Sequence, residues 1–163
     1  MSIESERRFL LANDNWRDLV WDSTNIKQGY LCDDPERIVR IRVSDNECFI
    51  TIKGVKTNGS GLEFEYSISL PDSVKLLELC KQPIIKKTRY NVVFIDSDKS
   101  TQDWEIDVFG GDNTGLIIAE LELEDISSDI ELPSWLGLEI TNDIKYANNN
   151  LATNPYKDWY HLF

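Results

Sequence analysis

Hydrophobic and polar residues alternate along most of the chain with the period of two that is typical of β-strands. The clearest example begins at Leu62, where Leu62 and Phe64 share one face and Glu63 and Glu65 share the other. Clusters of Gly, Asn, Asp and Ser, which favour turns, separate the alternating segments. The pattern predicts strands over residues 3–11, 28–32, 37–44, 48–55, 62–70, 85–95, 102–109 and 116–123.

Helical spacing is found in only two places. Pro71 marks a helix start, and residues 74–81 follow it with a short amphipathic pattern. A second helix is expected from Glu139 onward, because apolar residues as far as Leu151 recur at helical spacing. The aromatic tail, residues 154–163, is expected to pack against the rest of the chain. The fold class is therefore mainly β, an α+β protein with few helices.

Strand after strand carries one apolar face and one face that is charged rather than merely polar. In the first strand Glu4, Glu6 and Arg8 share a face. Such a grouping is costly without a partner, and a hard divalent cation beside a polyphosphate would supply one. A solvated strand face is the plain alternative. The charged faces together carry Glu4, Glu6, Arg8, Arg40, Arg42, Lys53, Lys87, Arg89, Glu105, Asp107, Glu120 and Glu122.

Two arrangements of these strands satisfy the alternation. The apolar faces pack inward as a sandwich and leave the charges in solvent, or the sheet closes with its charged faces inward. A buried array of both signs is tolerable only if the groups pair with each other or with bound ions. From the alternation alone we favour the sandwich, since it is the commoner architecture.

The overall charge limits the partners. The formal net charge of −12 argues against binding to nucleic acid or to an acidic membrane surface, and no apolar run is long enough to span a membrane. The three cysteines show no CxxC spacing, so a disulfide framework or a zinc site is not expected. No signal peptide is visible at the charged N-terminus, and we expect a cytoplasmic protein.

An ordered series of motifs resembles one known family. The opening Glu4-Ser5-Glu6-Arg7-Arg8 resembles the ExExK motif of the CYTH family, also called the triphosphate tunnel metalloenzymes. Further motifs match in family order at residues 28–31, 40–42, 51–53, 63–65, 87–90, 105–109, 119–122 and 133–146. The chain most resembles the short, single-domain bacterial members, which implies one domain over residues 1–163. The last motif position is Arg8 rather than lysine, and these two cations are not interchangeable.

The resemblance implies an eight-stranded antiparallel closed barrel, a tunnel with a charged lumen and a few flanking helices, and it reverses the preference for a sandwich. It implies metal-dependent hydrolysis of inorganic tripolyphosphate, or a related triphosphate, to pyrophosphate and phosphate. The substrate would be a small anionic triphosphate. A class IV adenylyl cyclase, which converts ATP to cyclic AMP and pyrophosphate, is one alternative. A catalytically weak polyphosphate- or nucleotide-binding module is the other.

The same resemblance assigns roles to residues. Oxygen ligands fit Mg²⁺ or Mn²⁺. The metal ligands implied are Glu4, Glu6, Asp107, Glu120 and Glu122, and a second metal or water would lie at Glu63, Glu65 or Glu105. The phosphate-binding residues implied are Arg8, Arg40, Arg42, Lys53, Lys87, Arg89 and Lys145. The residues nearest the chemistry are Glu4, Glu6, Arg8, Tyr30 and Lys87.

Two residue groups near the C-terminus receive separate predictions. His161 is the only histidine and is taken as structural, so proton transfer would depend on a carboxylate or on water at the metal. Tyr156, Trp159, Tyr160 and Phe163 would form a dimer contact if they are not buried.

Overall fold

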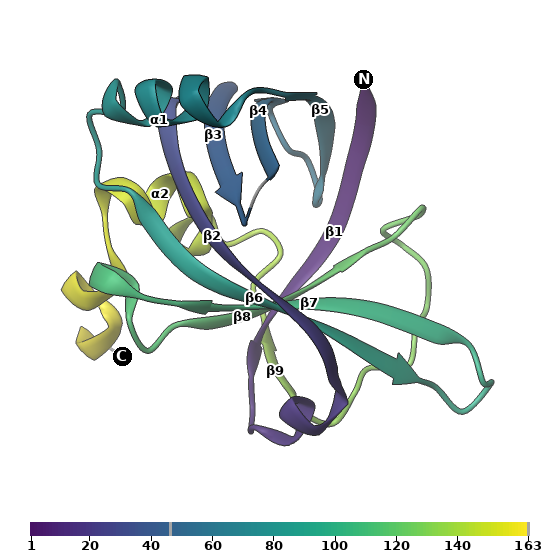
Figure 1. The fold of residues 1–163 in the computed structure, drawn as a ribbon. Helices are drawn as coiled ribbons and strands as arrows, with labels where there is room; N and C mark the ends of the chain where they lie inside the picture. The colour runs from purple at the N-terminus through teal and green to yellow at the C-terminus, as the bar shows by residue number, and fades with distance from the viewer. Residues whose placement is uncertain (46, 163) are drawn as a thin grey trace.

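The computed structural model, which describes residues 1–45 and 47–162, contains a sheet that curves round and closes on itself (Figure 1). The strands in this part of the chain are β1 (Ser2–Leu11), β2 (Val20–Cys32), β3 (Arg37–Ser44), β4 (Glu47–Gly54), β5 (Ser60–Ser67), β6 (Ile85–Ile95), β7 (Thr101–Phe109), β8 (Ile117–Glu122) and β9 (Leu136–Glu139).

Strand β1 closes the barrel. The sheet runs in the order β5-β4-β3-β2-β6-β7-β8-β1-β9, and the first half of β1 also pairs with β5, so that eight strands form a ring. On that same edge the second half of β1 pairs with β9 instead. All of these pairings are antiparallel. The closed barrel implied by the family resemblance is therefore confirmed.

The charged faces of the strands point into the ring. Direct cross-strand partners share a face of the sheet, and Arg8 lies opposite Glu120. Arg89 lies opposite Asp107 in the same way. The preference for a sandwich, based on alternation alone, was wrong, because the period of two shows which residues share a face and not which face is enclosed.

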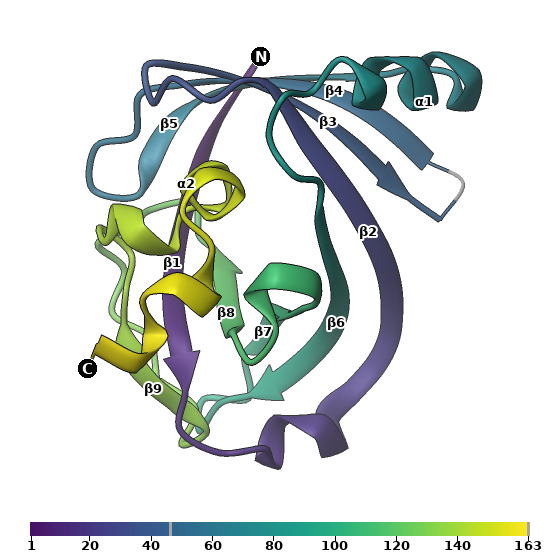
Figure 2. The same cartoon turned by 90° about the vertical axis from the view of Figure 1, so that its left-hand side faces the viewer.

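Two α-helices flank the ring, α1 (Leu70–Glu78) and α2 (Asn148–Thr153). Helix α1 packs on the outside of β2, β3 and β4 (Figure 1). It begins before the predicted residue 74, because the Ser69 hydroxyl caps it by accepting a hydrogen bond from the Asp72 amide at 3.2 Å. Helix α2 lies across one opening of the ring, as the end-on view shows (Figure 2).

Two other predicted elements differ in the structure. The helix expected from Glu139 onward begins later, at Asn148, because Glu139 ends strand β9 and is paired with Phe9 of β1. The chain then makes a 3₁₀ turn at Ile144–Tyr146 before α2 begins. The predicted strand at 28–32 is the end of the much longer β2, whose first half is polar and lacks clear alternation.

Two hydrophobic clusters hold the barrel. One lies on the outer faces of β1, β7 and β8, where the rings of Phe9 and Trp135 contact Trp104 edge to face. The other fills one end of the lumen beneath α2 and includes Tyr30, Leu151 and the other residues of the same cluster.

The aromatic tail packs on this second cluster, as predicted. Trp159 is buried and contacts Tyr146 and Tyr156, whereas Tyr160 is exposed and stacks on Tyr156. Phe163, which was assigned to the same tail, lies outside the described residues.

Among the described helices, none has the length and apolar character needed to cross a lipid bilayer.

Candidate active site

The inner faces of the strands line a cavity of about 560 Å³ that is bounded by the residues around α2. All of the site residues predicted from the sequence line it except Asp107 and Lys145. Asp107 is fully buried just behind the lining. Lys145 holds its ammonium over the rings of Tyr146 and Trp159 and near Asp143. The barrel therefore brings together side chains from eight strands that lie far apart in the sequence.

Two guanidiniums, those of the buried Arg40 and the half-buried Arg42, occupy one wall. Both nitrogens Nε and Nη2 of Arg42 donate to the Gln28 side-chain oxygen, at 3.1 and 3.0 Å. Arg40 donates from Nη2 to the Thr51 hydroxyl at 3.3 Å, and its Nε is buried without a hydrogen-bond partner. In the described part of the chain neither has a carboxylate within ion-pair distance. Burial, with Arg40 nearby, lowers the pKa of Arg42 to about 10, so it is charged at neutral pH.

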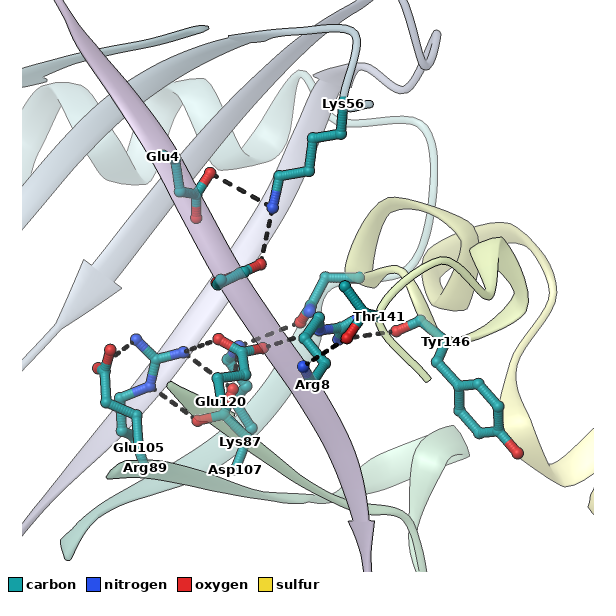
Figure 3. A network of polar contacts seen from close by, with 12 residues as sticks. Glu4, Arg8, Lys56, Lys87, Arg89, Glu105, Asp107, Glu120, Thr141 and Tyr146 are labelled. Carbon is teal, nitrogen blue, oxygen red and sulfur yellow. Dashed lines mark hydrogen bonds and ion pairs between the residues drawn. The ribbon is translucent and has the colours of Figure 1, made fainter. Parts of the chain in front are cut away.

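Lys87, Arg89 and Asp107 form the most enclosed part of the site (Figure 3). Lys87 donates to Asp107 at 2.7 Å and to the Asn148 side-chain oxygen at 3.0 Å. Arg89 donates to both oxygens of Asp107, from Nε at 2.8 Å and from Nη2 at 2.9 Å, and to Glu105 at 2.7 Å. Burial would raise the pKa of Asp107, but the two cations outweigh it and hold the pKa well below its usual range.

Arg8 links the barrel to the C-terminal segment (Figure 3). Its Nε donates to Glu120 at 3.2 Å, and its Nη2 donates to the Tyr146 carbonyl at 3.0 Å. Its backbone amide also donates to the Thr141 hydroxyl at 3.1 Å. The guanidinium thus donates hydrogen bonds in two different directions, to Glu120 and to the Tyr146 carbonyl. A lysine ammonium reproduces this geometry poorly.

The opposite wall is acidic and begins with Glu4. Lys53 lies 2.9 Å from Glu4 and 3.6 Å from Glu63, and so joins two carboxylates of neighbouring strands. Burial would raise the pKa of Glu4, but Lys53 and Lys56 outweigh it and lower the pKa to about 2. Burial and the adjacent Glu4 raise the pKa of Glu63 above its ordinary value. The two carboxylates therefore differ in proton affinity although they share one lysine.

Lys56 is a site residue that the sequence did not reveal. Its ammonium lies 2.7 Å from Glu6 and 3.5 Å from Glu4, between the two carboxylates of the opening motif (Figure 3). Lys56 belongs to the β4–β5 loop and not to a strand, so the alternation carries no information about it. The loop is brought to β1 by a hydrogen bond from the Glu6 amide to the Gly59 carbonyl.

Gln28 and Asn148 were also missed. The Gln28 amide nitrogen donates to the Tyr30 hydroxyl at 3.0 Å and to the Asn148 side-chain oxygen at 3.1 Å. Burial raises the pKa of Tyr30, so its phenol keeps its proton at neutral pH. Gln28 stands at an inward position of β2, a signal that could have identified it, whereas Asn148 lies in a region with no strand pattern.

The donor set of the acidic wall fits a hard divalent cation. Glu6 and Glu122 are direct cross-strand partners, an arrangement of like charges that is unfavourable unless a cation neutralises it. Their oxygen atoms are the ligands that Mg²⁺ and Mn²⁺ prefer. Within residues 1–45 and 47–162, no three acidic, histidine or cysteine side chains converge on one point, because lysine and arginine side chains lie between the carboxylates.

Glu65 and Glu105, which were predicted to bind water or a second metal, lie apart from each other. Glu65 accepts a hydrogen bond from the Thr51 hydroxyl at 3.4 Å. Glu105 is bonded to Arg89, and burial raises its pKa. Each of them lines the cavity.

Comparison with known proteins gives a consistent set of relatives. The CYTH domain family model matches residues 2–156. An inorganic triphosphatase of Acetivibrio thermocellus is 39% identical over 160 residues, which cover 98% of this chain and 99% of the relative. An inorganic triphosphatase of Nitrosomonas europaea is 32% identical over 152 residues, 91% of this chain and 96% of the relative. The crystal structure of the inorganic triphosphatase NE1496 matches with a TM-score of 0.62 and 31% identity, over 93% of this chain and 95% of that chain.

Proposed function

The chain belongs to the CYTH domain family, and we propose that it hydrolyses inorganic tripolyphosphate to pyrophosphate and phosphate with a divalent metal ion, Mg²⁺ or Mn²⁺. Two relatives that match over nearly their whole length are inorganic triphosphatases, which supports this choice of substrate. We infer that residues 1–163 act together as one catalytic domain.

The observation that carries the proposal is the pair of guanidiniums of the buried Arg40 and the half-buried Arg42. Buried cations without a carboxylate partner are unfavourable unless an anion binds to them. The Arg40 Nε, buried without a partner, is a donor aimed at such an anion. Guanidiniums bind phosphate oxygens through paired hydrogen bonds, and a linear triphosphate carries several such oxygens.

Other cations that line the cavity complete the phosphate site. Lys53, Lys87 and Arg89 line the same cavity, and Arg8 faces it from β1. Their fixed charges would stabilise the charge that develops on the phosphoryl oxygens during in-line attack by water at a terminal phosphorus. Tyr30, which keeps its proton, would donate a hydrogen bond to a phosphate oxygen.

The acidic wall would bind the metal. We assign Glu4, Glu6, Glu120 and Glu122 to this role. A divalent ion there would neutralise phosphate charge and lower the barrier to attack by water. Asp107 is assigned instead to holding Lys87 and Arg89 in place.

Glu63 and Glu105, whose pKa values burial raises, are the carboxylates that we assign to accept the proton of the attacking water, with Glu65 on the same strand as Glu63. The assignment follows from the fact that a base with a pKa nearer neutrality is more effective at neutral pH.

The test is phosphate release from tripolyphosphate, ATP, thiamine triphosphate and pyrophosphate, measured with Mg²⁺, with Mn²⁺ and with EDTA. We expect fast release from tripolyphosphate that EDTA abolishes and that a Glu4→Gln/Glu6→Gln double variant lacks. An Asp112→Asn variant, altered at a surface pair with Lys157, is the control and should match the unmodified protein. Absence of phosphate release from every substrate would refute the proposal.

The products distinguish the alternatives. Pyrophosphate together with cyclic AMP from ATP would identify an adenylyl cyclase. Tight metal-dependent binding without turnover would identify a binding module. A role for Lys145 in substrate binding, a homodimer through the aromatic tail and a cytoplasmic location without nucleic-acid or membrane partners remain predictions from the sequence.

A further inference from the structure

The ammonium of Lys56 lies where the proposed metal would have to bind. We propose that Lys56 is a tethered counter-ion, which neutralises Glu4 and Glu6 in the metal-free protein and is displaced when a divalent cation binds, so that it weakens metal affinity. The inference rests on the metal role given to these two carboxylates in the proposed function.

The argument begins with the shared oxygen atoms. The Lys56 ammonium is 2.7 Å from Glu6 Oε1 and 3.5 Å from Glu4 Oε2. A metal ion that uses these carboxylates binds at 2.0–2.6 Å from their oxygens, as is typical of Mg²⁺ and Ca²⁺ sites. A divalent ion at that distance from Glu6 Oε1 would lie within a few ångströms of the Lys56 ammonium, and the two positive charges repel each other. Metal binding therefore favours movement of the Lys56 side chain away from the carboxylates.

The loop is built so that the side chain can move while the backbone stays in place. The Gly59 carbonyl accepts a hydrogen bond from the Glu6 amide at 3.1 Å, and Thr57 and Ser60 bond each other through their backbones. The Lys56 side chain is 34% exposed, which is about twice the exposure of Lys53 at 15%. A swing of the Lys56 stem toward solvent breaks none of the loop's backbone bonds.

Lys53 differs from Lys56 in a way that separates their roles. Lys53 projects from strand β4 and lies between Glu4 and Glu63. It therefore keeps Glu63 as a carboxylate partner when Glu4 binds a metal ion. Within the described residues, the ion pairs of Lys56 are those with Glu4 and Glu6. Of the two lysines, only Lys56 loses its whole set of ion pairs to the metal.

The inference is tested by direct metal binding to the substrate-free protein. Mn²⁺ affinity would be measured by titration calorimetry for the unmodified protein, Lys56→Met and Lys56→Arg, with Lys157→Met as the control for loss of one positive charge. Exposed ion pairs are weak, so we expect Lys56→Met to bind Mn²⁺ about three- to fivefold more tightly. Lys56→Arg and Lys157→Met should bind with the unmodified affinity.

A second measurement uses the unmodified protein. Acetylation of Lys56 by an anhydride, followed by mass spectrometry, should be several-fold faster with saturating Mg²⁺ than with EDTA, because the displaced amine meets solvent. Unchanged Mn²⁺ affinity of Lys56→Met, or equal acetylation in both conditions while Mn²⁺ binds, overturns the inference and leaves the metal site intact. If neither the unmodified protein nor Lys56→Met binds Mn²⁺, the metal role in the proposed function fails, and the inference fails with it.

Discussion

The ammonium of Lys87 lies 2.7 Å from the carboxylate of Asp107, and both side chains are shielded from solvent, with exposures of 1% and 0%. Asp107 also accepts two hydrogen bonds from Arg89. One buried carboxylate therefore stabilises two cations. Both cations also line the cavity, where a phosphate group can bind to them.

Asp107→Asn is expected to destabilise the protein strongly. It leaves the buried Lys87 without a carboxylate partner and weakens the hold on Arg89, which costs about 3–5 kcal/mol of unfolding free energy. Lys87→Met should cost less, because Arg89 still bonds Asp107. Chemical denaturation measures both values. The surface variant Asp112→Asn should lose less than about 1 kcal/mol, and an equal loss for Asp107→Asn would contradict this account.

Arg40→Met is expected to impair activity without loss of stability. It removes a buried charge with no carboxylate partner, so the unfolding free energy should be unchanged or higher. The lost charge-assisted hydrogen bonds to phosphate should lower kcat/KM for tripolyphosphate by about 10- to 100-fold. Steady-state kinetics measures the change in kcat/KM, and thermal unfolding measures the change in stability. The exposed Arg37→Met carries the same charge change and should alter neither.

Arg8→Lys is expected to lose stability and keep activity. One ammonium cannot bond Glu120 and the Tyr146 carbonyl in the geometry of the guanidinium, so the carbonyl loses its donor at a cost of about 1–2 kcal/mol. A cation still faces the cavity, so tripolyphosphate hydrolysis should stay within about tenfold. Thermal unfolding beside a phosphate assay provides the measurement, with exposed Arg17→Lys as the control. An unchanged melting temperature would argue against the bridging role.

The Arg7–Glu139 pair should add an acid-sensitive contribution to stability. Arg7 donates to both oxygens of Glu139, at 3.0 and 2.8 Å, which lowers the pKa of Glu139 below its usual 4.5. Because the folded-state pKa is the lower one, this stability is present above about pH 4.5 and is lost as the pH falls through the folded value.

Glu139→Gln tests the sign of that effect. The variant should be less stable than the unmodified protein at pH 7, by less than about 1 kcal/mol since the pair is partly exposed, and the difference should shrink as the pH falls from 7 to 3. Thermal unfolding across this pH range follows the difference, and Glu36→Gln, at an exposed position, provides the baseline. A difference in stability that stays the same at every pH would rule out the ionic contribution.

Gly59→Ala should distort the β4–β5 loop. Gly59 has φ of +78°, and an added Cβ would lie 2.7 Å from the Glu6 carbonyl oxygen. Gly111 also has a positive φ, +57°, but its Cβ would meet nothing within 4 Å. In both variants the alanine must adopt a left-handed backbone conformation, which lowers the unfolding free energy by about 1 kcal/mol. The unfolding free energy of Gly59→Ala should fall by about 1–2 kcal/mol more. Denaturant midpoints compare them, and equal losses would show that the contact with β1 is unimportant.

The alternation of residues predicted the inner face of the barrel correctly. Glu4, Arg40 and Glu120 were grouped as one charged set because a period of two places alternate residues on one side of a strand. The same alternation cannot decide whether that side is enclosed, since this depends on pairing between distant strands. The family resemblance supplied that choice, and the pairing of β1 with β5 and β8 accounts for it physically.

Residues outside the strand pattern could not be found in this way. Lys56 reaches the site because Asn58 and Gly59 take left-handed conformations that turn the loop back to β1. Asn148 reaches it because the chain crosses the end of the ring before α2. The apolar spacing after Glu139 suggested a helix, but strand pairing with Phe9 determines the backbone there.

The position of β1 has a consequence for the order of events during synthesis. Strand β1 is made before the other strands of the sheet, yet its partners end at residues 67, 122 and 139. A nascent chain that has not reached residue 122 lacks part or all of β8, so one edge of β1 stays unpaired until most strands of the sheet have been made. Contacts at this sequence separation form slowly, and exposed edges invite association with other chains. The charged residues of the opening motif belong to this strand, and their charge disfavours association of its unpaired edge with other chains.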